Sequence, residues 1–183
     1  MKRTSLLLFL LVFCFATAMQ AQAPAPEPDP ALKKLHAAVG HWTFEGEQKS
    51  GPLGPSGKFT AEATCRMILG GFFFQCQATV KAAESETRLL EIDGYDPVDK
   101  NFSNEYYFND GSRISGSLTV TGNTWTYEGK WATAGKQYQY KETWILAPDL
   151  RSGTDKIEIS VDGETWTPLS ESRWTKAQPA AKK

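Results

Sequence analysis

Two consecutive segments near the middle of the chain, residues 125–131 and residues 138–146, alternate between aromatic and polar side chains. A period of two places alternate residues on opposite faces of a β-sheet, so both segments are predicted to be strands with one buried face. That face carries a carboxylate, Glu142, among rings that combine an apolar body with a polar tip. It is therefore either a polar core or the wall of a ligand cavity. Its aromatic members are Trp125, Tyr127, Trp131, Tyr138, Tyr140 and Trp144.

Turn signals recur about every ten residues after residue 40, a rhythm typical of an all-β sandwich or barrel. The links are too short for helical crossovers, so neighbouring strands should be antiparallel. One helical segment, residues 31–39, precedes them. We predict an all-β, antiparallel up-and-down barrel of about ten strands with one short N-terminal helix, closed so that no strand edge is exposed. The expected strands are residues 41–48, 58–69, 72–81, 87–95, 101–108, 112–120, 124–132, 137–147, 156–161 and 164–175.

Two details of this barrel follow from single strands. The pair Leu89-Leu90 interrupts the alternation of the fourth strand and suggests a β-bulge. In the ninth strand, Ile157, Ile159 and Val161 are expected to face inward.

The N-terminus has the pattern of a secretory signal peptide. A basic start at Lys2 and Arg3 is followed by an apolar stretch over residues 6–15, too short to span a bilayer. Residues 16–18 offer an A-x-A cleavage site and residues 21–23 a second one, so cleavage is expected after residue 18 or 23. These features predict a periplasmic or secreted protein.

The remaining chain divides into a Pro-rich linker over residues 19–30, the barrel over residues 31–175 and a disordered tail over residues 176–183. Removal of residues 1–18 leaves 165 residues and takes the formal net charge from −1 to −3. With no basic stripe, this balance argues against a nucleic-acid partner. No later segment is long and apolar enough to cross a membrane.

The two cysteines outside the signal peptide are predicted to pair. If Gly70-Gly71 is a two-residue hairpin loop, Cys65 lies directly opposite Cys76, at a separation that allows a disulfide. An exported compartment permits the bond. A structural cross-link is the simpler interpretation, and a redox pair is the alternative.

One end of the barrel has its own signature. Trp42 opens the first strand after the short helix, and Arg173 lies near the end of the last strand. An Arg over a Trp is a cation–π arrangement that would close this end, which is a structural role.

The chain resembles the calycins, the lipocalin-like barrels, and more narrowly the exported bacterial proteins of domain-of-unknown-function family 1579. The resemblance covers about residues 32–175. It implies a lipocalin-like fold and no settled activity. Haem-binding barrels of the nitrobindin type ligate iron through a His near the C-terminus, but this chain has only His36 and His41, so no cofactor is expected. The resembling residues are Leu35, Gly40-His41-Trp42, Leu69-Gly-Gly71-Phe72-Phe73, Gly94-Tyr95-Asp96-Pro97, Lys100, Phe102, Asp110-Gly111, Gly116 and Gly122-Asn-Thr-Trp125.

No metal site is predicted. The Asp-rich segment with Asp93, Asp96 and Asp99 lacks the spacing of an EF-hand and is better explained as a turn. The two histidines lie close together and no C-x-x-C accompanies them, which argues against zinc.

We expect the barrel to bind a small hydrophobic or amphipathic molecule with one polar group. Burial should raise the pKa of Glu142 unless a cation or hydrogen-bond donors compensate, and Arg173 or a Tyr hydroxyl is its expected partner. The alternatives are an interaction module with a filled aromatic core and, with no catalytic signature in the sequence, an enzyme that uses Glu142. The expected wall comprises the six aromatic residues above with Glu142, Asn104, Tyr106, Phe74, Phe72 and Phe102.

Overall fold

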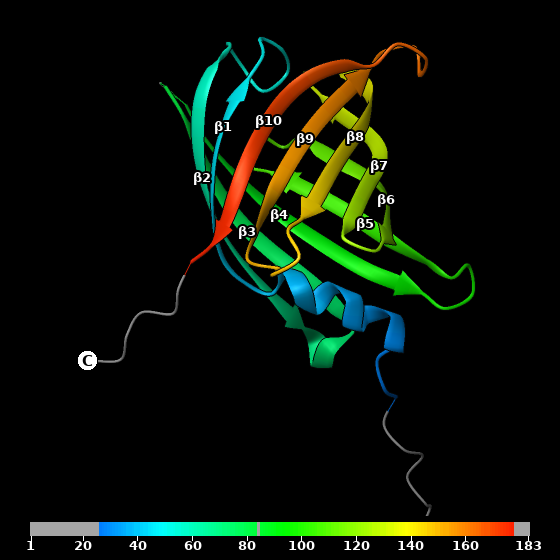
Figure 1. Ribbon diagram of the computed structural model, residues 1–183. Coiled ribbons are helices and arrows are strands. Elements are labelled where there is room, and N and C mark those ends of the chain that lie inside the picture. Colours follow the sequence, from blue (N-terminus) through cyan, green and yellow to red (C-terminus); the bar gives the residue numbers. More distant parts are fainter. Residues whose placement is uncertain (1–25, 84, 178–183) are drawn as a thin grey trace, which may run out of the picture.

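The computed structural model describes residues 26–83 and 85–177. The predicted signal peptide, its cleavage sites and most of the predicted tail lie outside this part of the chain. Ten antiparallel strands form one closed barrel, in which each strand pairs with its sequence neighbours and β1 pairs with β10 (Figure 1). The predicted fold is confirmed. The strands are β1 (Gly40–Gln48), β2 (Gly57–Ile68), β3 (Phe73–Ala82), β4 (Ser85–Asp96), β5 (Asn101–Phe108), β6 (Arg113–Thr121), β7 (Thr124–Thr133), β8 (Lys136–Leu146), β9 (Ser152–Ser160) and β10 (Thr167–Lys176).

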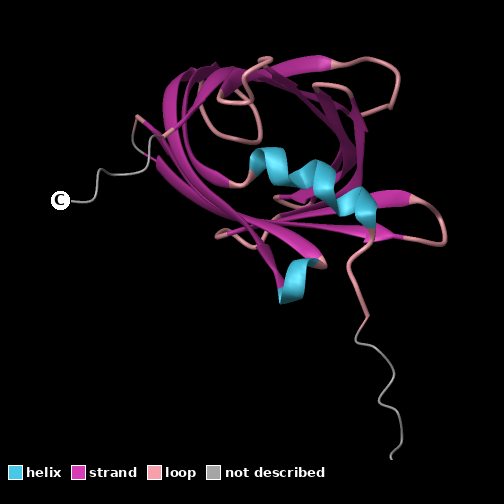
Figure 2. Cartoon of the chain, turned by 60° about the horizontal axis from the view of Figure 1, so that its bottom comes forward, coloured by secondary structure: helices cyan, strands magenta, loops and turns pink. Residues whose placement is uncertain are grey.

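A short helix, η1 (Pro30–Ala38), lies across one end of the barrel (Figure 2). It is a 3₁₀-helix whose first turn is capped by the side chain of Asp29. Its buried face is held to β1 by a 2.7 Å hydrogen bond from Trp42 Nε1 to the carbonyl oxygen of Ala38. In residues 26–83 and 85–177, no helix combines the length and apolarity that crossing a membrane requires. The buried residues of η1 are Leu32, Leu35 and Ala38.

The alternation of β4 is unbroken. Its pairing with β3 and with β5 continues through Leu89 and Leu90 without a shift, so the predicted bulge is wrong. The register shift of the barrel falls instead in β10, between Pro168 and Ser170. Every second residue of β4 from Leu89 onward therefore faces the interior.

The hairpin of β2 and β3 has the predicted register but a longer link. Cys65 pairs with Cys76 and the two form a disulfide, as predicted. The last paired residues are Ile68 and Phe73, and the turn η2 (Leu69–Gly71) lies between the strands. Three successive residues of the turn, Leu69, Gly70 and Gly71, have positive φ angles, which the two glycines adopt without steric cost.

The end of the barrel beneath η1 is closed by Trp42, whose ring packs edge-on against Trp174 with centroids 4.9 Å apart. The predicted cover by Arg173 is wrong. Trp174 points inward, so its neighbour Arg173 points to solvent beside Glu45. The cation over the Trp42 ring is Lys176, which was expected in the tail but ends β10, with Nζ 4.9 Å from the ring centroid.

The boundaries of β9 also differ from the sequence-based expectation. β9 begins at Ser152, four residues earlier than predicted, and ends at Ser160. Val161 consequently lies beyond the strand and is 81% exposed, so its predicted inward position is wrong.

The half of the barrel next to η1 is filled with side chains. Strands enter or leave this end at the β2–β3, β4–β5, β6–β7 and β8–β9 links, and the inward residues near those links are buried. This filled half forms one hydrophobic core with η1. Its large members are Trp42, Phe74, Phe102, Leu118, Trp125, Tyr127, Leu146 and Trp174.

Candidate binding cavity

The half of the barrel away from η1 contains a cavity of about 140 Å³. It extends from the middle of the barrel to the rim, where Leu53 of the β1–β2 loop and Ser85 at the start of β4 contribute to its lining. Most of the wall is apolar. The apolar lining consists of Phe44, Leu53, Phe59, Ala61, Ala63, Ala78, Val80, Ala82, Leu89, Phe108, Ile114, Trp131, Trp144 and Ile157, together with Cys76 of the disulfide.

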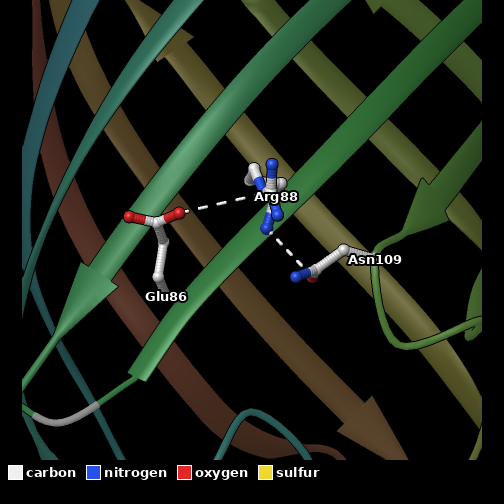
Figure 3. A network of polar contacts seen from close by, with 3 residues as sticks. All are labelled: Glu86, Arg88 and Asn109. Atoms are coloured by element: carbon white, nitrogen blue, oxygen red, sulfur yellow. Dashed lines mark hydrogen bonds and ion pairs between the residues drawn. The ribbon is translucent and has the colours of Figure 1, made fainter.

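The charged side chains of Glu86 and Arg88, on β4 near this rim, are absent from the cavity lining (Figure 3). The backbone of Arg88 exchanges hydrogen bonds with Asn109, donating to its Oδ1 at 3.0 Å and accepting from its backbone N–H at 2.9 Å. The Arg88 side chain is 3.8 Å from Glu86, and both side chains are largely exposed. Such an exposed pair contributes little stability, but the backbone contacts extend the β4–β5 pairing beside the rim.

Four carboxyl groups are buried in the middle of the barrel: Glu91 and Asp93 of β4, Glu142 of β8 and Asp155 of β9. We call them the acidic cluster. Three of them, Glu91, Glu142 and Asp155, line the cavity, and Asp93 lies behind them toward the filled half. The lining contains no Lys, Arg or His within the described chain.

Glu142 is held by neutral donors. Its Oε2 accepts hydrogen bonds from the hydroxyls of Tyr140 at 2.6 Å and Tyr106 at 3.0 Å, and its Oε1 accepts from Trp144 Nε1 at 2.7 Å. Of the two expected partners, the Tyr hydroxyl is correct and Arg173 is wrong. Burial raises the pKa of Glu142, and these three hydrogen bonds oppose that rise.

Tyr106 connects Glu142 to Glu91. Its hydroxyl oxygen lies 3.0 Å from Glu142 Oε2 and 3.1 Å from Glu91 Oε1. A hydroxyl has one proton to donate, so both contacts are hydrogen bonds only when one of the two carboxyls is itself protonated. Glu91 is the better candidate, because burial and the charges of Asp93 and Glu142 raise its pKa well above the ordinary value.

Asp93 is the most deeply buried member of the cluster. Its Oδ1 accepts a 2.7 Å hydrogen bond from Asn104 Nδ2, while its Oδ2 has no partner within the described chain. Burial is the main cause that raises the pKa of Asp93 to about 7. Asn104 therefore serves the acidic cluster and does not reach the cavity.

Asp155 is the carboxyl of the cavity wall with the fewest hydrogen bonds. It is 8% exposed, and its Oδ2 accepts a 3.4 Å hydrogen bond from Ser172 Oγ. Its Oδ1 has no hydrogen-bond partner among the described residues, and neither does Nε1 of Trp131. Burial, and then the charge of Glu142, raise the pKa of Asp155 well above its ordinary value.

The structure divides the predicted ligand-binding residues into two sets. Trp131, Tyr140, Glu142, Trp144 and Tyr106 line the cavity. The others do not. Trp125, Tyr127, Phe74, Phe102 and Asn104 belong to the filled half, Tyr138 packs against Trp131 outside the lining, and Phe72 precedes β3.

The sequence does not predict three members of the acidic cluster. Glu91 lies two residues after Leu89, where two adjacent leucines disguise the alternation, and Asp93 belongs to an Asp-rich segment that predicts a turn. Asp155 precedes the predicted ninth strand. An unbroken count of two through both strands would have found all three.

The candidate metal and cofactor residues lie elsewhere. Among the described residues, no group of three or more His, Cys, Asp or Glu side chains is arranged to hold a metal ion. His36 and His41 are both exposed, away from the interior. Asp96 forms the predicted turn, since its Oδ1 accepts hydrogen bonds from the backbone N–H groups of Val98 and Asp99.

Comparison with known proteins agrees with this fold. A family model described as "Protein of unknown function (DUF1579)" matches residues 27–175. The crystal structure of Rv2717c from M. tuberculosis is similar over 83% of this chain and 100% of that chain, with a TM-score of 0.60 and 15% sequence identity. At that identity, the likeness concerns the fold alone. A search of curated proteins found no match.

Proposed function

The chain belongs to the DUF1579 family of proteins of unknown function, and we propose that it binds a small, mostly apolar molecule inside its barrel. The observation that carries this proposal is the contrast between the two halves of the interior. One half is packed with large side chains, whereas the other keeps a cavity of about 140 Å³ that reaches the rim. Apolar walls with a few convergent polar groups are typical of small-molecule sites.

Tryptophan fluorescence tests the proposal directly, because Trp131 and Trp144 line the cavity. Titration with a library of small hydrophobic and amphipathic compounds should give a saturable quench or spectral shift with some members. Ala78→Leu, which places extra carbons in the cavity, should weaken binding at least about tenfold by removing space. Ala132→Leu on the exposed face of β7 is the matched control and should bind as the wild type does.

Two results would contradict binding in the cavity. One is the absence of any saturable response across the library. The other is equal affinity in the wild type and Ala78→Leu, which would place the ligand elsewhere. Either result would favour the interaction module, in which the aromatic interior serves only as a core.

A second candidate function is carboxylate-dependent catalysis. The observation that favours it is the Glu91–Tyr106–Glu142 arrangement, which puts two titratable carboxyls within hydrogen-bond distance of one hydroxyl. Such a pair meets the geometric requirement of general acid–base chemistry. Mass spectrometry of a bound compound after incubation separates the two functions: binding alone returns it unchanged, whereas catalysis returns a product.

We also propose that the protein works in the periplasm or outside the cell. The Cys65–Cys76 disulfide supports this location, because such bonds persist in oxidising compartments. Expression of the full chain in a bacterial host, followed by fractionation and intact-mass measurement, tests it. Export predicts a periplasmic product that has lost its first 18 or 23 residues.

A further inference from the structure

We infer that the polar group of the ligand is a cation, and that the cavity accepts a small organic ammonium ion with its charge against Asp155. This inference rests on the proposed binding function and names the chemical class of the ligand. Two independent features carry it: carboxyl groups without a cationic partner, and an aromatic wall around them.

The first feature is the charge inventory of the cavity. Glu91, Glu142 and Asp155 line it, Asp93 lies directly behind them, and no Lys, Arg or His of the described chain joins the lining. The ion pairs formed within residues 26–83 and 85–177 all lie on the outer surface and involve none of these four groups. Buried carboxylates are ordinarily paired with a cation, so this set lacks the partner that burial calls for.

Asp155 shows where that partner would bind. Glu142 already accepts three hydrogen bonds, and Glu91 is held by Tyr106. Asp155, in contrast, is 92% buried in the cavity wall, and its Oδ1 accepts no hydrogen bond from an N–H or O–H donor of the described structure. Its side-chain neighbour there is the Glu142 carboxyl, which is itself only an acceptor when ionised. An unsatisfied carboxyl oxygen at the wall of a cavity is the acceptor that a bound ammonium group would use.

The second feature is the aromatic wall. The rings of Tyr106, Phe108, Trp131, Tyr140 and Trp144 line the same cavity as the three carboxyls. Trp and Tyr faces attract organic cations through their quadrupoles, and quaternary ammonium groups are bound by aromatic walls of this kind. A metal ion fits less well, because no group of three or more ligating side chains among the described residues is arranged to hold one.

In the absence of a cation, protons take its place. Tyr106 lies within hydrogen-bond distance of two carboxyls but has a single proton to donate, so a proton on one of the carboxyls completes both contacts in the ligand-free protein. A bound ammonium ion would favour the ionised carboxylates and release protons, and its affinity should therefore rise with pH. The titratable groups that interact with Asp155 are Glu142 and Tyr140 of β8, whereas β10 contributes the neutral Ser172. Glu142 in turn interacts with Glu91 and Asp93 of β4, Tyr106 of β5 and Tyr127 of β7.

Three probes of similar shape test the inference by isothermal titration calorimetry. Phenyltrimethylammonium carries a permanent positive charge, tert-butylbenzene is its neutral counterpart, and benzenesulfonate is anionic. We expect the cation to bind at least about tenfold more tightly than the neutral probe, and the anion to bind weakest. The permanent charge of the ammonium probe assigns any pH dependence of its binding to the protein.

The outcomes separate this inference from the function on which it rests. Equal or tighter binding of tert-butylbenzene would overturn the cation inference and leave the cavity as a container for neutral molecules. Failure of all three probes, together with a negative fluorescence screen, would overturn both. A preference for benzenesulfonate would also overturn the inference.

A pair of variants assigns the preference to Asp155. Asp155→Asn keeps the shape of the side chain and removes its charge, and should abolish most of the preference for the cation while tert-butylbenzene still binds. Asp99→Asn makes the same chemical change at an exposed turn and should leave both affinities unchanged. If Asp155→Asn does not fold, proton release by the wild type on binding phenyltrimethylammonium, measured in two buffers of different ionisation enthalpy at pH 7, decides the question. Release supports the inference, and no release overturns it.

Discussion

At the scale of single residues, the unusual feature of this protein is a set of carboxyl groups that the fold keeps from water. Burial raises the pKa values of Glu91, Asp93, Glu142 and Asp155. A carboxyl whose pKa is higher in the folded than in the unfolded chain binds its proton more tightly when folded. Stability contributed in this way is present at low pH and is lost as pH rises through the folded pKa.

We therefore predict that the free energy of unfolding falls between pH 5 and pH 8. Asp93, whose pKa rises from 3.8 to about 7, makes a defined contribution. Asp93→Asn should reduce the difference in unfolding free energy between the two pH values by about 1–4 kcal/mol, because its amide does not titrate. Urea denaturation of the wild type and the variant at pH 5 and pH 8 measures this difference, and Asp99→Asn is the control. A free energy of unfolding that rises from pH 5 to pH 8 would contradict the prediction.

A second prediction concerns the hydroxyl of Tyr106. Tyr106→Phe keeps the ring but leaves Glu91 and Glu142 without the group that lies between them. The loss should destabilise the fold by about 1–3 kcal/mol, the cost of unsatisfied buried polar groups. Tyr107→Phe, at the exposed neighbouring position, should change stability by less than about 0.5 kcal/mol. Equal effects of the two substitutions in chemical denaturation would argue against the network.

The sequence predicted one acidic residue of four. Glu142 was found because it sits in an unbroken aromatic alternation, which is a strong signal. Glu91 lies on the same face of β4 as Leu89. The two adjacent leucines hide the alternation of this strand in the sequence, although its pairing with β3 and β5 is continuous. The contacts of Tyr106 across the barrel depend on closure, which brings together residues far apart in sequence.

At the scale of elements, η1 is joined to the barrel by side chains, with no backbone–backbone hydrogen bond to a strand among the described residues. It is attached through its buried face and through the hydrogen bond from Trp42 to Ala38. Leu35 is fully buried beneath it. The helix therefore depends on packing more than on its own hydrogen bonds.

We predict that Leu35→Ala destabilises the protein by about 2–5 kcal/mol, through lost burial and the cavity left behind. Lys34→Ala, one position away on the exposed face, should be nearly neutral. Thermal and urea unfolding of the two variants measure the difference. An equally small effect of both would mean that η1 does not cover the core in solution.

The strands, the helix and the register of one hairpin were the features most accurately predicted from the sequence. Ten strands and one helix were predicted, and the Cys65–Cys76 pairing followed from the register of one hairpin. The predictions were wrong where the alternation of apolar and polar residues is weak. The start of β9 at Ser152 lies in a polar stretch, and Arg173 points outward because its neighbour Trp174 points inward. Inward or outward position depends on the exact phase of each strand, and a shift of one residue reverses it.

At the scale of the whole molecule, the barrel combines a filled half with a hollow half. Filling the second half would add apolar contacts, so the space is kept at a cost in stability. We predict that Ala78→Leu leaves the free energy of unfolding unchanged or raises it by up to about 1 kcal/mol while it weakens ligand binding. Denaturation of the ligand-free variant measures the first effect and the fluorescence titration the second; strong destabilisation would show that the wall around Ala78 has no room.

The existence of the hollow half was beyond sequence reasoning. Aromatic residues of the same two strands fill one half and line the other: Trp125 is in the core, whereas Trp131 faces the cavity. Whether an aromatic residue is packed or lines the cavity depends on its position along the barrel axis and on the small residues, such as Ala61 and Ala63, on the opposite wall. These positions are known only once the barrel is closed.

The helix across one end also has a kinetic consequence. With η1 and the filled half behind it, the chamber is a dead end, and a bound molecule leaves by the rim through which it came. Exchange is then strictly sequential: an occupant must depart before a competitor can enter. A competitor added in excess should prevent rebinding without accelerating departure, so the residence time of the first molecule sets the pace of every replacement.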